Sequence, residues 1–331
     1  MKQYRITIIT ALLLTIGIIR INAQVCYTDH HVHLQDSATV ELGYRMLKAF
    51  GQAPTRIDSM VLDADTAIER LNRAHFNKAW IISNAYWFGS PLTPVSNEYE
   101  LVKQQNDWIE EQAERYPERL NAFMSVNPLK PYALKEIQRC ANTKRFIGLK
   151  LHFANSKINL FDKKHVAQLQ KVFALANKNH LAMLVHFRSG EKWDGQANTQ
   201  ILLQQLLPFA KNTKVVIAHM AGWGGYDKPT DAALGLIAAY TKNKSNQKNI
   251  YVEVSAVLPI DSIATDKPVR NKVAWNALMS LNKRIKQIGT DHILFGTDWP
   301  LIDIDPYIEL LNTALGTATV QQILQNKINF D

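Results

Sequence analysis

The sequence has 331 residues, of which 47% are hydrophobic, 20% charged and 9% aromatic, and these values suit one large globular domain or two modest ones. The formal net charge is +9. The basic residues are scattered along the chain and do not form a cluster. The charge pattern therefore does not predict a nucleic-acid-binding groove.

The first 23 residues have the layout of a secretory signal peptide. Two basic residues precede an apolar run, Ile6–Ile19, and the small residue Ala23 marks a cleavage position. The run is short for a membrane span, so an uncleaved anchor is the less favoured alternative. We therefore expect a leader over residues 1–23 and an exported mature domain over residues 24–331, periplasmic or secreted. Cleavage would lower the net charge from +9 to +6 and leave no stable membrane association.

Eight short apolar segments alternate with segments of helical spacing. The predicted strands are Val25–Val32, Ala79–Ser83, Leu120–Val126, Phe146–Leu151, Ala182–His186, Val215–His219, Ile250–Ser255 and Ile293–Thr297. The predicted helices are Asp65–Phe76, Glu98–Tyr116, Pro131–Ala141, Lys163–Asn179, Asn198–Lys211, Thr230–Thr241, Val269–Ile288, Pro306–Leu315 and Thr319–Ile328. Near-continuous apolar strands separated by amphipathic helices imply a parallel sheet.

Eight such units predict an α/β protein with a closed (β/α)₈ barrel, a TIM barrel, as a single domain. An open, doubly wound sheet is less favoured, because no glycine-rich phosphate turn follows the first strand. The loop over residues 34–64 is long enough to form a lid or a substrate wall at the barrel mouth. A second segment, residues 87–97, would border the same mouth.

The segment Asp29-His30-His31-Val32-His33 gives the first sign of a metal site. Side chains two apart on an extended strand share a face, so His31 and His33 can hold one divalent ion. Alone, this pattern is weak evidence. It gains weight because further polar residues end later strands, and strand ends converge on one mouth in a barrel. These residues are Lys150, His152, His186, His219 and Asp298.

The same motifs, in this order, resemble those of the amidohydrolase superfamily. The resemblance looks closest to the amidohydrolase-related branch that includes aminocarboxymuconate-semialdehyde decarboxylase-like proteins, and it spans residues 25 to about 330. The matching segments are Asp29-x-His31-x-His33, Gly148-Leu149-Lys150-Leu151-His152, Val185-His186, Ile217-Ala218-His219 and Phe295-Gly296-Thr297-Asp298-Trp299-Pro300. Phe153 and Lys327 depart from the branch, which often has Pro and Ala at these positions.

The resemblance implies one metal ion, with zinc expected and manganese as an alternative. Its ligands would be His31, His33, His186 and Asp298. Metal-activated water would attack the substrate, Asp298 would take its proton, and His219 would polarise the carbonyl group. We therefore expect a hydrolase that cleaves a C–O or C–N bond in a lactone, ester or amide. A decarboxylase on the same site is the first alternative, and a barrel that only binds a ligand is the second.

Lys150 leaves the number of metals open. In binuclear members of the superfamily a strand-four lysine bridges two ions, and Lys150 and His219 would then serve the second one. In single-metal members the lysine would instead bind a substrate carboxylate.

The expected partner is a small, carboxylate-bearing molecule, and the chain does not settle whether a homodimer forms. Candidate substrate contacts are Lys150, His152, Arg188, Trp223 and Trp299. Arg188 could clamp a carboxylate or form a surface salt bridge. The two cysteines, Cys26 and Cys140, could pair in an exported protein, although nothing in the sequence places them together.

The choice between one metal and two yields a first test. The variant His219→Asn should lose most of its turnover and keep its metal if a single ion is bound by the other ligands. Metal content per chain, measured by plasma mass spectrometry, checks this. Substantial metal loss in the variant would favour the binuclear arrangement.

Overall fold

The structure is a computed structural model of the whole chain. It describes residues 26–328 except residues 50, 52, 55–56, 191, 223–224, 244–248 and 259–271. The expected leader over residues 1–23 lies outside the described residues. Within the described part of the chain, no helix has both the length and the apolar character needed to cross a membrane. Both cysteines are free, so the pairing considered above does not form.

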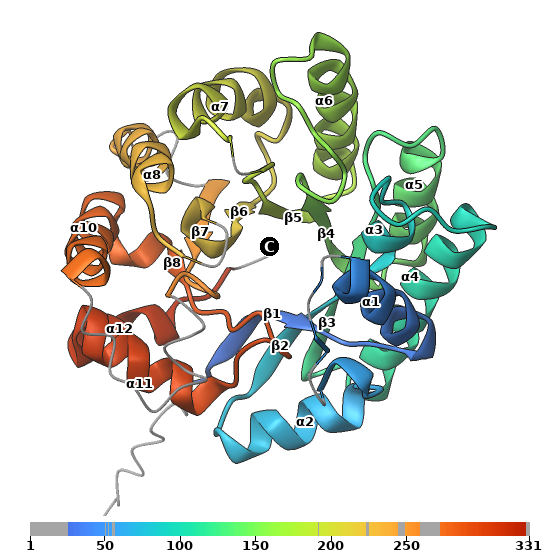
Figure 1. Cartoon of the computed structure of the whole chain (residues 1–331), viewed down its shortest axis with the longest axis horizontal. Coiled ribbons are helices and arrows are strands. Elements are labelled where there is room, and N and C mark those ends of the chain that lie inside the picture. The colour runs from blue at the N-terminus through green and yellow to red at the C-terminus, as the bar shows by residue number, and fades with distance from the viewer. Residues whose placement is uncertain are drawn as a thin grey trace, which may run out of the picture.

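Eight parallel strands form the centre of the molecule and lie side by side in chain order. They are β1 (Thr28–His33), β2 (Lys78–Ile82), β3 (Leu120–Ser125), β4 (Phe146–His152), β5 (Ala182–His186), β6 (Val215–Ile217), β7 (Ile250–Glu253) and β8 (Ile293–Leu294). Backbone hydrogen bonds join the last strand region to the first, from His30 N to Phe295 O and from His33 N to Trp299 O. The strands therefore form a nearly closed ring (Figure 1), and the predicted TIM barrel is confirmed.

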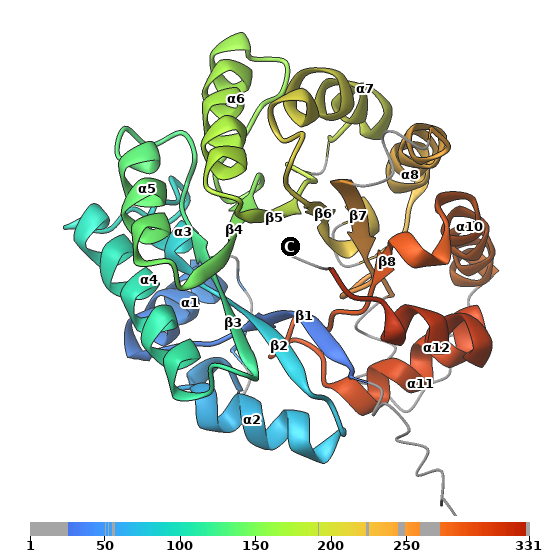
Figure 2. The ribbon, with the colours of Figure 1, turned by 180° about the vertical axis from the view of Figure 1, so that it is seen from behind.

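Helices surround this ring in both views (Figures 1 and 2). They are α2 (Ala64–Arg73), α4 (Glu98–Arg115), α5 (Ala133–Thr143), α6 (Lys163–Lys178), α7 (Gly195–Ile201), α8 (Lys228–Thr241), α10 (Lys272–Ile288), α11 (Ile304–Leu315) and α12 (Thr317–Gln325). Because the strands face helices outside and one another inside, β5 is buried along its whole length. The inward layer includes Phe123, Leu184, Val216 and Leu294. Because the barrel interior is apolar, we expect the reactive polar side chains at the ends of the strands.

Two parts of the helical prediction were wrong. The segment 34–64 contains the helix α1 (Ser37–Ala49), and a short helix, α3 (Ala85–Phe88), includes the first two residues of the segment 87–97. Leu42 of α1 and Phe88 of α3 pack in one apolar cluster with α4. The spacing of Ala38, Leu42 and Met46 carries the signal for α1, because residues four apart share a helix face.

The predicted helix 198–211 is also interrupted. Regular α-helix ends at Ile201, and a wider turn over Leu202–Leu206 and a tighter one over Leu207–Phe209 follow. Pro208 lies in the last turn and cannot donate a backbone hydrogen bond, which is incompatible with a continuous helix interior. The predicted helix over Val269–Ile288 is confirmed from Lys272 onward, and residues 269–271 lie outside the described residues.

A buried polar network fastens the seam between β1 and the segment after β8. Arg70 of α2 donates to Asp29 (Nη1 to Oδ2, 3.0 Å) and to Thr297 (Nη2 to Oγ1, 2.9 Å). Thr297 in turn donates its amide and its hydroxyl to the two oxygens of Asp29, at 3.0 and 2.7 Å. Asp29 is fully buried, and burial raises the pKa of its carboxyl group against the opposing effect of Arg70.

This network predicts that Arg70→Met destabilises the fold much more than Arg73→Met. The first change leaves the buried Asp29 carboxylate without its cation, which costs about 3–5 kcal/mol in comparable cases. Arg73 is 63% exposed in its pair with Asp303, so its loss should cost about 1 kcal/mol or less. Urea unfolding of both variants measures the difference, and equal losses would contradict the role given to the network.

Candidate metal centre

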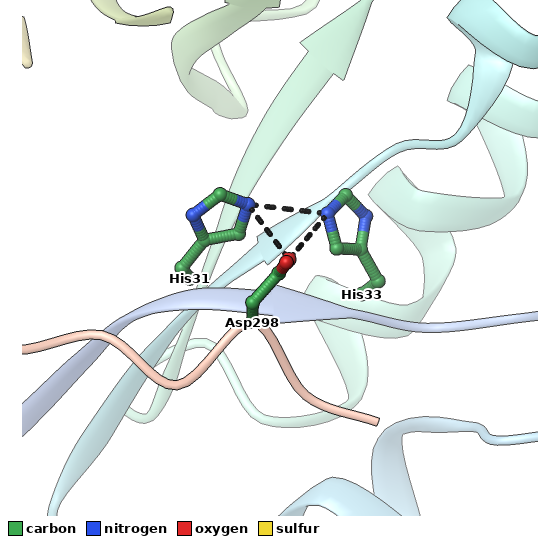
Figure 3. Close-up of side chains that lie close together, drawn as sticks. All are labelled: His31, His33 and Asp298. Carbon is green, nitrogen blue, oxygen red and sulfur yellow. Dashed lines mark hydrogen bonds and ion pairs between the residues drawn. The ribbon is translucent and has the colours of Figure 1, made fainter. Parts of the chain in front are cut away.

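Two histidines of β1 and one aspartate after β8 bring their side chains to one point (Figure 3). His31 Nε2 lies 3.2 Å from His33 Nε2 and 3.2 Å from Asp298 Oδ1, and His33 Nε2 lies 3.4 Å from the same oxygen. His31 is fully buried, whereas the side chains of His33 and Asp298 are 12% and 19% exposed. The cluster therefore lies at the inner edge of the barrel mouth.

The donor set fits a divalent metal ion. Ligands that bind one ion at about 2.1 Å, with angles of about 90–110° between the bonds, lie about 3.0–3.4 Å apart. The three measured separations fall in this range. Two imidazoles and one carboxylate also form a known type of metal site that leaves open positions for other ligands. The residues present thus match a metal centre in both chemistry and spacing.

The local backbone explains why these side chains meet. The amide of Asp298 donates to the carbonyl oxygen of His31 at 2.9 Å, so one backbone hydrogen bond joins the two ligand residues. Asp298 has a left-handed φ of 62°, which an L residue adopts rarely and which directs the chain away from the strand. Strain of this kind is common at functional sites.

His219 begins a second departure from regular backbone, at the end of β6. His219, Met220 and Ala221 all have left-handed φ values, of 56°, 50° and 62°. The His219 ring lies face to face with that of His31, with 5.0 Å between the ring centroids. Burial lowers the pKa of His219 to about 4, so the imidazole is neutral near pH 7.

Glu253 is the site residue that sequence reasoning missed. It is the last residue of β7 and is fully buried. Its Oε1 lies 3.0 Å from His31 Nδ1 and accepts a hydrogen bond from the backbone amide of His219 at 3.1 Å. Ser255, two residues later, lies with its Oγ 2.8 Å from His219 Nδ1 and donates to Glu253 Oε1. The signal was available, because Ile250-Tyr251-Val252-Glu253-Val254 has one acid in an otherwise apolar strand.

The predicted ligand His186 lies beside the cluster of His31, His33 and Asp298 rather than among its converging donor atoms. Its ring stacks on that of His152 at 3.8 Å and 11°, and lies 4.8 Å edge-on from the ring of His219. Tyr86 of α3 extends this stack, at 5.0 Å from His152. His186 as a fourth ligand stays a prediction.

Lys150 of β4 reaches the same centre from the opposite side of the barrel. Its Nζ lies 2.8 Å from His31 Nε2, and only 1% of the residue is exposed. Burial lowers the pKa of Lys150 to about 8, against the opposing effects of Asp298 and Glu253. The lysine is therefore close enough to serve a substrate at the centre.

Arg188 and Trp299, two further predicted substrate contacts, have other partners in the structure. Arg188 forms the salt bridge considered above, with Asp227 at 2.7 Å, and its guanidinium lies 5.8 Å from the ring centroid of Trp193. Trp299 is buried on the seam, where its ring packs 5.3 Å from the guanidinium of Arg70. Trp223 lies outside the described residues.

Comparison with known proteins decides the family. The profile described as "Amidohydrolase" matches residues 28–325, which is most of the chain. The chain belongs to the amidohydrolase family. The sequence-based resemblance to this superfamily is thereby confirmed.

Several relatives of the chain are named as decarboxylases. Gamma-resorcylate decarboxylase of Polaromonas sp. is 24% identical over 290 residues, which covers 80% of this chain and 86% of the relative. The 5-carboxyvanillate decarboxylase of Novosphingobium aromaticivorans, solved with manganese and a nitrobenzoic acid derivative, has a TM-score of 0.61 at 13% identity. It covers 93% of this chain and 95% of its own.

A relative with a different name shares the fold as well. A probable 2-pyrone-4,6-dicarboxylic acid hydrolase of Acinetobacter baumannii has a TM-score of 0.57 at 15% identity and covers 90% of this chain and 95% of its own. At such identities these structures establish the shared barrel. The main expectation of hydrolysis is therefore not confirmed, and the similarity to gamma-resorcylate decarboxylases agrees better with the decarboxylase alternative.

The close approach of the segment after β8 to Glu253 gives a prediction about Gly296. A Cβ atom at this position would lie 2.1 Å from Glu253 Oε2 and 3.1 Å from His31 Cβ. The variant Gly296→Ala should therefore displace both groups, lower the free energy of unfolding by about 1–3 kcal/mol, and weaken metal binding.

Gly190→Ala is the matched control, because a Cβ there meets nothing within 4 Å. Urea unfolding and metal titration of both variants measure the two effects. If the Gly296→Ala variant behaved like the control, the packing of Glu253 against Gly296 would be refuted.

Proposed function

We propose that this amidohydrolase-family protein is a metal-dependent, non-oxidative decarboxylase of a small hydroxyaryl carboxylic acid. The observation that carries the proposal is the His31–His33–Asp298 donor cluster in a chain that is similar to gamma-resorcylate decarboxylases. The hydrolase expected from the sequence has less support from these relatives.

A divalent ion held by His31, His33 and Asp298 would act as a Lewis acid toward the substrate oxygens. The donor set suits manganese as well as the zinc expected from the sequence, because it combines imidazole and carboxylate. Manganese is bound by the Novosphingobium relative. We therefore propose one divalent ion, with His186 as a further ligand, and a preference for manganese.

Asp298 is the group that we assign to proton transfer. Its side chain is 19% exposed at the mouth, whereas the other carboxylate of the centre, Glu253, is fully buried and out of reach of a substrate. Against the opposing effect of burial, the neighbouring histidines hold the pKa of Asp298 well below its usual range, so it rests as a carboxylate. In the proposed reaction Asp298 takes up a proton from solvent at the mouth and passes it to the ring carbon that bears the substrate carboxylate. The C–C bond then breaks, CO₂ leaves, and the ring carbon keeps the new C–H bond.

Lys150 supplies positive charge on the β4 side of the same centre. Its Nζ is held 2.8 Å from His31 Nε2, so a substrate oxygen that approaches the centre meets this cation at short range. The stack of Tyr86, His152 and His186 forms the adjoining wall. We propose that these residues orient the substrate, and that the protein acts after export, as the leader-like residues 1–23 indicate.

The proposed reaction can be separated from hydrolysis in one assay. Full-length protein loaded with Mn²⁺ is incubated in D₂O with 2,6-dihydroxybenzoate or 5-carboxyvanillate, and in parallel with 2-pyrone-4,6-dicarboxylate. Decarboxylation predicts CO₂ release and one deuterium at the carbon that lost the carboxylate, measured by mass spectrometry. Acid release from the pyrone with no CO₂ from either benzoate would contradict the proposal.

The role of Asp298 predicts that Asp298→Asn lowers turnover at least about 10³-fold, because the amide cannot donate a proton as an acid and is a weaker metal ligand. Asp305→Asn is the matched control, since this exposed acid lies in the first turn of α11, outside the site. CO₂ release from both variants is the measurement. Equal activity of the two would remove Asp298 from the reaction.

A further inference from the structure

Glu253 and Ser255 connect the two histidines that lie deepest in the centre. Glu253 Oε1 is 3.0 Å from His31 Nδ1, and Ser255 Oγ is 2.8 Å from His219 Nδ1. Ser255 and Glu253 are also hydrogen-bonded to each other. His31, Glu253 and Ser255 are fully buried. Together with the His219 ring they form one chain of contacts behind the metal centre.

The protons in this chain can be assigned from donor and acceptor counts. A serine hydroxyl has a single proton, and Ser255 donates it to Glu253 Oε1. Ser255 Oγ must then accept from His219 Nδ1, and the carbonyl oxygen of Ser255, at 3.0 Å from the same nitrogen, can only accept. The Nδ1 atom of His219 therefore carries a hydrogen.

The same count applies to His31. Glu253 Oε1 receives the Ser255 hydroxyl and the His219 amide, so it serves as an acceptor in both contacts. An oxygen that accepts these two hydrogen bonds also accepts the third, from His31 at 3.0 Å, which places the hydrogen of His31 on Nδ1. The unprotonated Nε2 of His31 then faces His33 and Asp298.

We propose that Glu253 and Ser255 are positioning residues that hold His31 and His219 in the Nδ1–H tautomer, so that both Nε2 lone pairs are available to the metal centre. Hydrogen bonds from ligand imidazoles to buried carboxylates fix ring orientation and raise ligand basicity. A neutral His219 in this tautomer accepts a proton or a metal at Nε2. It cannot donate there, in contrast to the carbonyl-polarising role expected from the sequence.

The packing around Glu253 supports a fixed position. Its Oε2 is buried and has no hydrogen-bond partner within the described part of the chain, so its contacts with the histidines and the serine run through Oε1. Gly296 leaves space for this oxygen, since a Cβ atom there would lie 2.1 Å away. The seam and β7 together hold the carboxylate against His31.

The variant Glu253→Gln tests the proposal, with Glu136→Gln as the matched control. Glu136 is equally buried and hydrogen-bonded, to Asn106 and Arg139, but it lies on α5 away from the centre. Full-length proteins freed of metal by a chelator are titrated with Mn²⁺, and free Mn²⁺ is followed by electron paramagnetic resonance. The expected result is an affinity about 10- to 100-fold weaker for Glu253→Gln and unchanged for Glu136→Gln.

A second readout reports the tautomers directly and needs no turnover. Long-range ¹H–¹⁵N spectra of the metal-free, histidine-labelled chain should show His31 and His219 protonated at Nδ1, with assignments from His31→Asn and His219→Asn. In Ser255→Ala, His219 should shift toward a tautomer mixture. Nε2–H signals for either histidine in the unsubstituted protein, or wild-type Mn²⁺ affinity in both Glu253→Gln and Ser255→Ala, would overturn the proposal.

These readouts stand apart from the decarboxylation assay. A protein that binds Mn²⁺ with the predicted dependence on Glu253 but releases no CO₂ would refute the proposed reaction and support the positioning role. A protein that releases CO₂ with its histidines in the other tautomer would do the reverse.

Discussion

The seam between β1 and the segment after β8 is the constraint on which the rest of the site depends. The donors of the metal centre come from both sides of this seam, and they are almost 270 residues apart in the chain. The hydrogen bond from Asp298 N to His31 O sets their spacing. The buried Asp29–Arg70–Thr297 network then fastens the same seam from the side of α2. A barrel that failed to close here would keep its strands but lose its candidate centre.

The roles proposed for the two carboxylates of the centre follow from their different exposure to solvent. Asp298 is partly exposed and can meet a substrate, whereas Glu253 is sealed behind the histidines. One is therefore suited to moving a proton and the other to holding imidazoles in place. The neutral state of His219, whose pKa burial lowers to about 4, agrees with a role as acceptor.

Much of the fold was readable from the sequence because the strands and helices differ in their apolar periodicity. The strand ends His31, His33, Lys150 and Asp298 could be placed at one mouth, since parallel strands in a barrel share a direction. Hydrolysis could not be distinguished from decarboxylation, because both reactions use the same metal-binding residues. The number of metals was also left open, because Lys150 could either bridge two ions or bind a substrate carboxylate.

What the sequence did not yield depends on tertiary packing. Glu253 resembles a lone acid in an apolar strand until β7 brings it against His31. The helix α1 was taken for a loop, although its apolar residues Ala38, Leu42 and Met46 are spaced for a helix that packs on α3 and α4. The left-handed backbone of His219 and Asp298 has no sequence signature of its own, because neither residue is glycine.

Anomalous diffraction from crystals of the full chain grown with Mn²⁺ would test the central claim most directly. One strong manganese peak is expected, bounded by His31 Nε2, His33 Nε2 and Asp298 Oδ1, with Glu253 on the far side of the His31 ring. A peak elsewhere, or ordered crystals in which these three side chains bind no manganese, would contradict the claim that closure of the barrel seam builds the metal centre.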